Sequence, residues 1–206
     1  MSQPPIIELY KGDLPDGLDL GPAVAIDTEA LGLHPQRDRL CLVQLSEGDG
    51  SAVMVQLAGS YDAPELKRLL ADQSVLKLFH FARFDMAVLK HSLGVMPWPV
   101  YCTKIASRLA RTFTDRHGLK DLAKELLGIE LSKQQQSSDW GADQLTQEQL
   151  NYAASDVLYL HALKEKLEAM LVREGRQGLA QACFAFLPTR VELDLKGWPD
   201  LDPFAH

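Results

Sequence analysis

Three short apolar runs in the N-terminal part of the chain constrain its fold most strongly. They cover residues 23–27, 40–46 and 52–57, and each is rich in Val, Leu, Ile or Met. Runs of this length predict buried β-strands. The second and third runs are separated by Glu-Gly-Asp-Gly-Ser, which is typical of a hairpin turn. We therefore expect an antiparallel three-stranded meander.

Helical and strand patterns follow the meander. Strands are expected at 75–80 and 100–103, next to helices at 63–72 and 83–93. Further helices are expected at 104–112, 118–128, 146–171 and 176–186. The helix at 146 begins with a capping box, formed by Thr146 and Gln149. This order predicts an α/β fold with a mixed five-stranded sheet flanked by helices.

The length and composition favour one domain. With 206 residues, 46% of them hydrophobic, the chain can form one sizeable core. We expect a single domain over residues 1–206. Pro188 is expected to end the last helix, and residues 187–206 are expected to form an extended tail. The tail contains apolar residues, so it should dock on the body of the protein or on a neighbouring subunit.

The charge and the cysteines limit where the protein acts and what it binds. The formal net charge of -7 argues against a broad basic surface that grips long nucleic acid without specificity. Cys41, Cys102 and Cys183 are far apart and set among apolar residues, which is typical of reduced thiols. No window resembles a signal peptide or a membrane span. We expect a cytoplasmic protein with no membrane partner.

Two acids end the first apolar run. Asp27 and Glu29 are two residues apart on the predicted strand, so their side chains share one face of the sheet. By itself this spacing is a weak signal, because many strands end in acids where they meet solvent. A metal site is the alternative interpretation.

Further along the chain, two more segments carry acids at positions that favour a site. Asp85 lies in the first turn of a helix that follows a buried strand, where it could simply complement the helix dipole. Tyr152 and Asp156 are four residues apart on one helix face with apolar neighbours. Asp156 could be a partly exposed helix acid, but burial would demand a partner for its charge.

Taken together, these residues indicate a metal site. Carboxylate oxygens are the natural ligands of Mg²⁺ and Mn²⁺. Four converging carboxylates would repel one another, and two divalent ions would relieve that repulsion. Such a pair of ions is typical of enzymes that hydrolyse phosphodiesters. The Tyr152 hydroxyl could then position the attacking water.

The order Asp-x-Glu, Asp and Tyr-x-x-x-Asp resembles the DEDD superfamily of 3′–5′ exonucleases, in its tyrosine-bearing subgroup. The segments FHFARFD, LLGIELSKQQQSSDW and LTQEQLNYAASDVLYL resemble the nuclease domain of the ribonuclease D family. Two features are expected to depart from that family: we expect no HRDC-type helical domain, and Cys102-Thr103 stands where an Asp-Thr pair is usual. RDRLCLVQLS, CTKIASRLARTFTDRHGLK and the C-terminal LDLKGWPDLDPFAH are similar to the nanoRNase C family.

This resemblance implies an RNase H-like exonuclease fold and a 3′–5′ exoribonuclease that uses two Mg²⁺ or Mn²⁺ ions. It further implies cleavage of very short RNA, notably dinucleotides such as pGpG, by a ring-shaped homo-octamer. It assigns metal binding to Asp27, Glu29, Asp85 and Asp156, and orientation of the water to Tyr152. Leu33 matches a leucine that wedges between the two bases in dinucleotide-cleaving relatives; its alternative is an ordinary buried loop leucine.

Other residues near these motifs could touch the substrate. Lys104, Arg108 and Arg111 are spaced at helical intervals and could form a basic stripe, which is usually a solvated face. The remaining candidates for substrate binding lie at strand ends and in a polar loop. They are Thr28, His80, Phe81, Lys133 and Ser137.

Three other functions compete with a dinucleotide-cleaving enzyme. The first is a general ribonuclease D-like exonuclease without a strict length preference. The second is an exonuclease that uses the same metals to trim DNA. The third is an inactive fold that serves as a nucleic-acid-binding or assembly module, which would be signalled by the loss of a metal-binding carboxylate. All four carboxylates are present.

Overall fold

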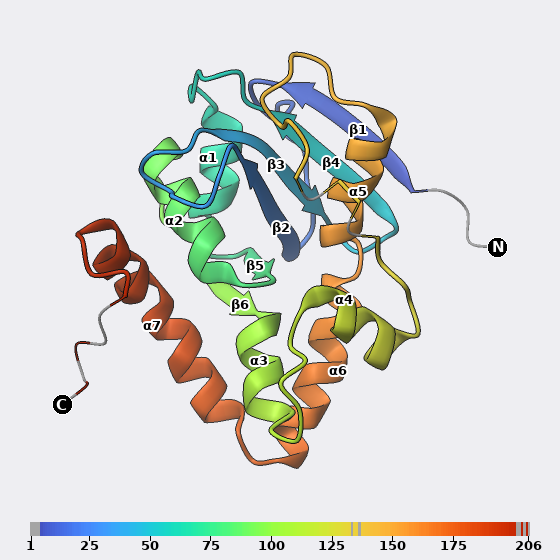
Figure 1. The fold of residues 1–206 in the computed structure, drawn as a ribbon, viewed down its shortest axis with the longest axis vertical. Helices are drawn as coiled ribbons and strands as arrows, with labels where there is room; N and C mark the ends of the chain where they lie inside the picture. The colour runs from blue at the N-terminus through green and yellow to red at the C-terminus, as the bar shows by residue number, and fades with distance from the viewer. Residues whose placement is uncertain (1–4, 133, 136, 201–202, 204, 206) are drawn as a thin grey trace.

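Figure 1 shows the computed structural model, which describes residues 5–132, 134–135, 137–200, 203 and 205. A mixed sheet with the strand order β1-β4-β3-β2-β5-β6 forms its centre. The strands are β1 (Ile6–Lys11), β2 (Ala23–Ala30), β3 (Leu40–Ser46), β4 (Ser51–Gln56), β5 (Leu76–Phe79) and β6 (Val100–Cys102). Strands β2, β3 and β4 pair antiparallel, which confirms the predicted meander. The other three pairings are parallel.

The sheet has six strands rather than the five expected from the sequence. The additional strand is β1, which pairs in parallel with β4 at the edge of the sheet. Its sequence is Ile-Ile-Glu-Leu-Tyr-Lys, in which Glu8 interrupts the apolar run that marks a buried strand, and the side chains of Ile6 and Leu9 are exposed. An edge strand is held by backbone hydrogen bonds to one neighbour, and this pairing leaves no clear pattern in the sequence.

Helices cover both faces of the sheet. They are α1 (Pro64–Ala71), α2 (Ala82–Leu93), α3 (Thr103–Ala110), α4 (Leu119–Leu122), the π-helix η1 (Ala123–Leu127), α5 (Gln147–Val157), α6 (Leu160–Arg173) and α7 (Gln177–Leu195). Side chains alternate across a strand, so Thr28 and its neighbours Asp27 and Glu29 point to opposite faces of β2. Thr28 contacts α2, whereas Asp27 and Glu29 meet α5, which places these helices on opposite faces.

The helix expected over residues 146–171 is two helices. Helix α5 ends at Val157, and α6 begins at Leu160, after Tyr159 with φ −110° and ψ 0°. Apolar residues continue at helical spacing across this break, because Val157, Leu160 and Leu163 are all buried in the same core. Periodicity alone therefore could not reveal the change in direction.

The C-terminal segment also differs from the prediction. Residues 187–195 are helical rather than extended, because α7 continues through Pro188 to Leu195. Proline removes one backbone hydrogen bond, but burial of Phe184, Leu187 and Val191 on the core side holds the helix together. Docking of the tail is confirmed for the residues just after α7. Arg83 of α2 donates to the Pro199 carbonyl at 2.6 Å.

None of the helices in the described part of the chain combines the length and the apolar composition needed to cross a bilayer.

Candidate active site

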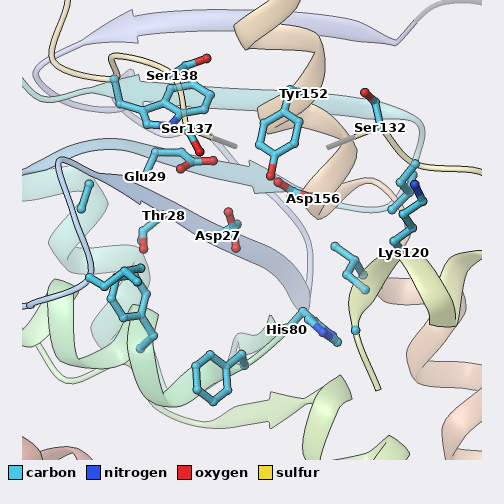
Figure 2. Close-up of a pocket in the computed structure, with 18 of the residues that line it drawn as sticks. Asp27, Thr28, Glu29, His80, Lys120, Ser132, Ser137, Ser138, Tyr152 and Asp156 are labelled. Atoms are coloured by element: carbon cyan, nitrogen blue, oxygen red, sulfur yellow. The ribbon is translucent and has the colours of Figure 1, made fainter. Parts of the chain in front are cut away.

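Strand β2 brings the first two acids of the site together. Its pleat points Asp27 and Glu29 to the same face, towards α5. Ligand oxygens of Asp27, Glu29 and Asp156 all lie within 4.8 Å of one another. Figure 2 shows these three carboxylates turned towards a common space. Asp-x-Glu on this strand is therefore part of a site and not a solvated strand end.

Helix α5 supplies the phenol and the third acid. It begins at the predicted capping box, in which the Gln149 amide N–H donates to Thr146 Oγ1 at 3.2 Å, and the Thr146 N–H donates to Gln149 Oε1 at 2.9 Å. This start fixes the phase of the helix, so Tyr152 and Asp156 face β2 one turn apart. The Tyr152 hydroxyl lies beside the Asp156 carboxylate (Figure 2) and hydrogen-bonds to it. The ring of Trp140 packs near that of Tyr152, with centroids 6.1 Å apart.

Asp85 lies in the first turn of α2, where the sequence predicts it, and is only 3% exposed. It accepts a hydrogen bond of 2.7 Å from the Thr28 hydroxyl. Thr28 is 5% exposed, so this bond is shielded from water. The Thr28 hydroxyl is thus placed to orient Asp85, and the predicted contact of Thr28 with the substrate stays a prediction.

The four acids, Asp27, Glu29, Asp85 and Asp156, are called the carboxylate cluster below. Burial is the main cause that raises the pKa of every member. It raises the pKa of Glu29 to about 9, and charge repulsion from Asp156 and Asp85 adds to this effect. The pKa values of Asp85 and Asp156 rise to about 7, and that of Asp27 lies well above its ordinary value. The hydrogen bond from Thr28 opposes the shift at Asp85.

The donor set fits divalent metal ions. Within the described residues, no lysine or arginine forms an ion pair with a member of the carboxylate cluster. The Gln44 amide reaches Asp27 only at 3.4 Å. Buried carboxylates without a cationic partner are costly. Hard divalent cations such as Mg²⁺ prefer carboxylate oxygens, so they would supply the missing positive charge.

Asp27, Glu29 and Asp156 line a cavity of about 900 Å³, whereas the buried Asp85 lies behind Thr28 and does not border it. Of the substrate-binding candidates, Thr28, Leu33, His80, Phe81 and Ser137 line it. Leu33 is 82% exposed, so the alternative of a buried loop leucine is wrong. Lys133 lies outside the described residues.

Two of these candidates occupy special local structures. The His80 ring is held through Nδ1, which lies 2.9 Å from Thr103 Oγ1. Burial lowers the pKa of His80 to about 3, so the ring is neutral. Phe81 adopts a left-handed backbone conformation with φ 70°, which is rare for a residue with a side chain. Its exposed ring lies 4.1 Å from the Lys104 ammonium.

Further residues line the cavity, and Phe84 and Ser132 among them were not predicted from the sequence. Lys120, Ser138 and Trp140 also border the cavity, together with Lys104 from the expected basic stripe. The stripe itself does not form. Arg108 is exposed, whereas Arg111 follows the end of α3 and turns into the interior, where it is 1% exposed.

A family model described as 3′-5′ exonuclease matches residues 13–172. Among relatives of known name, ribonuclease D of Granulibacter bethesdensis is 37% identical over 155 residues, which are 75% of this chain and 39% of that protein. The chain therefore spans well under half the length of this relative.

Solved structures are similar over nearly the whole chain. Brucella melitensis NrnC bound to pGG is 59% identical, with a TM-score of 0.95 over 98% of this chain and 99% of that one. Brucella melitensis NrnC with bound Mg²⁺ is also 59% identical, with a TM-score of 0.93 at the same coverage. Escherichia coli RNase D is 27% identical, with a TM-score of 0.74 over 83% of this chain and 45% of that one. These similarities confirm the resemblance and the exonuclease fold expected from the sequence.

Proposed function

The chain belongs to the 3′–5′ exonuclease family, and we propose that it is a metal-dependent exoribonuclease that hydrolyses very short RNA, above all dinucleotides such as pGpG. One observation carries the proposal: three carboxylates from β2 and α5 converge within 4.8 Å in a cavity bordered by Tyr152 and an exposed leucine. The similarity to NrnC, whose structure has been solved with pGG, supports a short RNA substrate.

Asp27, Glu29, Asp85 and Asp156 would hold two Mg²⁺ or Mn²⁺ ions. When bound, the ions would stabilise charge on the attacking and the leaving oxygen of the phosphodiester. The similarity to NrnC with bound Mg²⁺ supports the choice of metal. Thr28 contributes by holding one oxygen of Asp85, so that the other oxygen keeps a fixed direction.

Tyr152 would orient the attacking water. Burial is the first cause that raises the pKa of Tyr152, and the neighbouring acids raise it further. The phenol therefore stays protonated and can take part in hydrogen bonds as a neutral group. Replacing Tyr152 by Phe should slow hydrolysis about 100-fold, a typical contribution of a group that positions or transfers a proton. The variant should keep its Mg²⁺-dependent thermal shift, which would separate water positioning from metal binding.

Leu33 would set the length of the substrate by inserting between the two bases. A leucine that is 82% exposed has an apolar side chain free to pack on a ligand. His80, Phe81 and Ser137 line the same cavity and would contact the nucleotides, with Lys133 as a further candidate.

The assembly and the compartment belong to the same proposal. A ring-shaped homo-octamer is supported by exposed apolar side chains away from the cavity, such as Ile6, Phe113, Leu179 and Trp198. Native mass spectrometry would test it. A cytoplasmic location is supported by the free cysteines Cys41, Cys102 and Cys183.

The substrate preference is tested by digesting pGpG, longer RNA and DNA oligomers at equal concentration with Mg²⁺. The proposal expects pGpG to be cleaved much faster than longer RNA. Equal rates would favour a general ribonuclease D-like exonuclease. Faster cleavage of DNA would favour a DNA-trimming enzyme. An absence of cleavage on all three substrates would favour an inactive binding module.

A further inference from the structure

Helix α7 lies outside the region that the exonuclease family model matches, since the match ends at residue 172 and α7 begins at Gln177. Nevertheless, its C-terminal end contacts two segments that carry site residues. One segment is the first turn of α2, which carries Asp85. The other is the loop of residues 31–39 between β2 and β3, called the Leu33 loop below.

The contact with α2 is a bidentate ion pair between Arg83 and Asp194. Arg83 Nε donates to Asp194 Oδ2 at 2.6 Å, and Arg83 Nη2 donates to Asp194 Oδ1 at 2.8 Å. The Asp194 side chain is only 13% exposed, and it also accepts from Arg190 Nη2 at 2.5 Å. Paired contacts between guanidinium and carboxylate groups fix orientation as well as distance. The end of α7 is therefore held at a defined position against α2.

The contact with the Leu33 loop uses the backbone of α7. Gln36 Nε2 donates to the Leu195 carbonyl at 2.8 Å. Leu195 is the last residue of the helix, where carbonyl groups have no partner within the helix. The helix end thus offers an acceptor that would otherwise bond to water, and Gln36 uses it to attach the loop.

The Leu33 loop also has internal order. Asp38 accepts from the His34 N–H at 2.9 Å and from Arg37 Nε at 2.7 Å. Gly32 makes this possible, because a Cβ at that position would lie 2.2 Å from Asp38 Oδ2. These bonds shape the loop, but they do not fix its direction relative to the rest of the protein. That direction requires an external contact such as the one made by Gln36.

Leu33 borders two hollows in the protein surface. One is the site cavity, and the other is a groove of about 380 Å³. Leu33, Phe81 and Phe84 border both, and Asp194 and Leu195 border the groove. A movement of the α7 end would therefore shift the support on which Leu33 rests.

We propose that the C-terminal end of α7 positions the Leu33 loop, with Gln36 and Asp194 as positioning residues for substrate length. The inference rests on the proposed function, because it assumes that Leu33 distinguishes dinucleotides from longer RNA. Groups that recognise a ligand must be held to within a fraction of an ångström by the contacts behind them. Helix α7 lies outside the residues that the exonuclease family model matches. It would thus adapt the active site that the family shares to short substrates.

The test compares kcat/KM for pGpG with kcat/KM for pGpGpG in two single-residue variants. We expect Asp194→Asn to lower this ratio about tenfold, since hydrogen bonds to charged groups are worth more than neutral ones. Gln36→Ala should lower it about threefold, the usual weight of one neutral hydrogen bond. Both effects should come from a higher KM for pGpG. Amide hydrogen exchange in residues 31–39 should become faster in both variants.

Matched controls come from the same helix. Glu192 lies near Asp194 in sequence but pairs with Lys196 and not with Arg83, so Glu192→Gln removes a nearby acid without breaking the ion pair. Gln177→Ala removes a glutamine at the opposite end of α7. Both should keep the wild-type ratio and the wild-type exchange. An equal loss of activity on both substrates in Asp194→Asn would overturn the inference, because it would indicate a general loss of folded enzyme.

Leu33→Ala separates the inference from the proposed function. A wild-type enzyme without length preference would overturn the dinucleotide function together with this inference. If the wild type prefers pGpG and Leu33→Ala loses that preference, the function stands. In that case, an unchanged ratio and unchanged exchange in Gln36→Ala and Asp194→Asn would overturn the role of α7 alone.

Discussion

Two regions of this protein hold charged side chains that are partly or fully withdrawn from water, and they differ in whether those charges have protein partners of opposite sign. Arg111, just after α3, is 1% exposed and is paired within the protein. It donates to the Arg116 carbonyl at 2.8 Å and to Ser107 Oγ at 3.2 Å, and it contacts Glu125. The carboxylate cluster receives only neutral donors in the described structure, such as the hydroxyl of Thr28.

This difference indicates that Arg111 stabilises the fold, whereas the carboxylate cluster is arranged to bind a ligand. A buried ion with protein partners needs nothing from outside, and its removal leaves those partners unsatisfied. Four converging acids, of which Asp85 is buried and the others half-buried, oppose folding when no cation is present. They are therefore expected only where something else supplies the positive charge. The same contrast predicts opposite responses to mutation in the two regions.

The largest effect is expected for Asp85→Asn. Loss of one metal ligand should reduce hydrolysis of pGpG about 10³-fold or more, because metal ions contribute several kcal/mol to transition-state stabilisation. The fold should remain, and in EDTA the variant should melt at the same or a higher temperature, since one repelling charge is gone. Steady-state kinetics and thermal melts measure both. Full activity would contradict the metal site.

Arg111→Ala should have the opposite effect, a loss of stability rather than a specific loss of hydrolysis. We expect the free energy of unfolding to fall by about 3 kcal/mol, the lower range for breaking a buried ion pair, because Glu125 retains partial contact with water. Chemical denaturation measures this loss. Arg116→Ala is the control, since Arg116 is exposed and lies 4.0 Å from the same carboxylate. An equal loss of stability in both variants would remove the contrast.

A pH titration of the metal-free protein should sharpen the comparison. The folded pKa values are about 7 for Asp85 and Asp156 and about 9 for Glu29. In the unfolded chain these acids titrate near 4. Between about pH 4 and pH 9 the folded state therefore binds more protons than the unfolded state, so stability falls as pH rises. We expect the melting temperature in EDTA to fall by at least about 5 °C across this range.

Saturating Mg²⁺ should abolish most of that decline, because bound cations replace the protons. Asp156→Asn in EDTA should show a shallower decline than the wild type. A melting temperature that rises with pH in EDTA would show that the cluster is ionised without metal.

The smallest effect is expected for Thr28→Val. The variant keeps the shape of the side chain but leaves Asp85 without its 2.7 Å hydrogen bond. The Mg²⁺ concentration at half-maximal thermal shift should rise about tenfold, the weight of one hydrogen bond to a charged group. Thr28→Ser should restore it. A higher KM for pGpG with unchanged Mg²⁺ dependence would instead assign Thr28 to the substrate.

Local patterns predicted much of the site. The spacing of Asp27 and Glu29 and that of Tyr152 and Asp156 follow directly from the strand and helix repeats. The capping box at Thr146 placed the start of α5 correctly. These features could be predicted because each depends on residues within one turn or one pleat.

Contacts between distant segments could not be predicted in the same way. The Thr28–Asp85 bond joins residues 57 positions apart, and nothing in the local sequence indicates that the hydroxyl donates to this carboxylate. Arg111 continues the helical spacing of Lys104, but α3 ends at Ala110, so the side chain turns inward. The edge strand β1 and the extension of α7 through Pro188 likewise depend on packing against the rest of the fold.

The position of Trp140 gives the protein an optical reporter. The chain has three tryptophans, of which Trp98 and Trp198 are partly exposed, whereas Trp140 is 2% exposed. Trp140 borders the cavity and packs near Tyr152. Its indole fluorescence should be blue-shifted relative to that of the other two and should change when a nucleotide enters the cavity. Binding could therefore be followed in real time with an unlabelled dinucleotide and the unmodified protein.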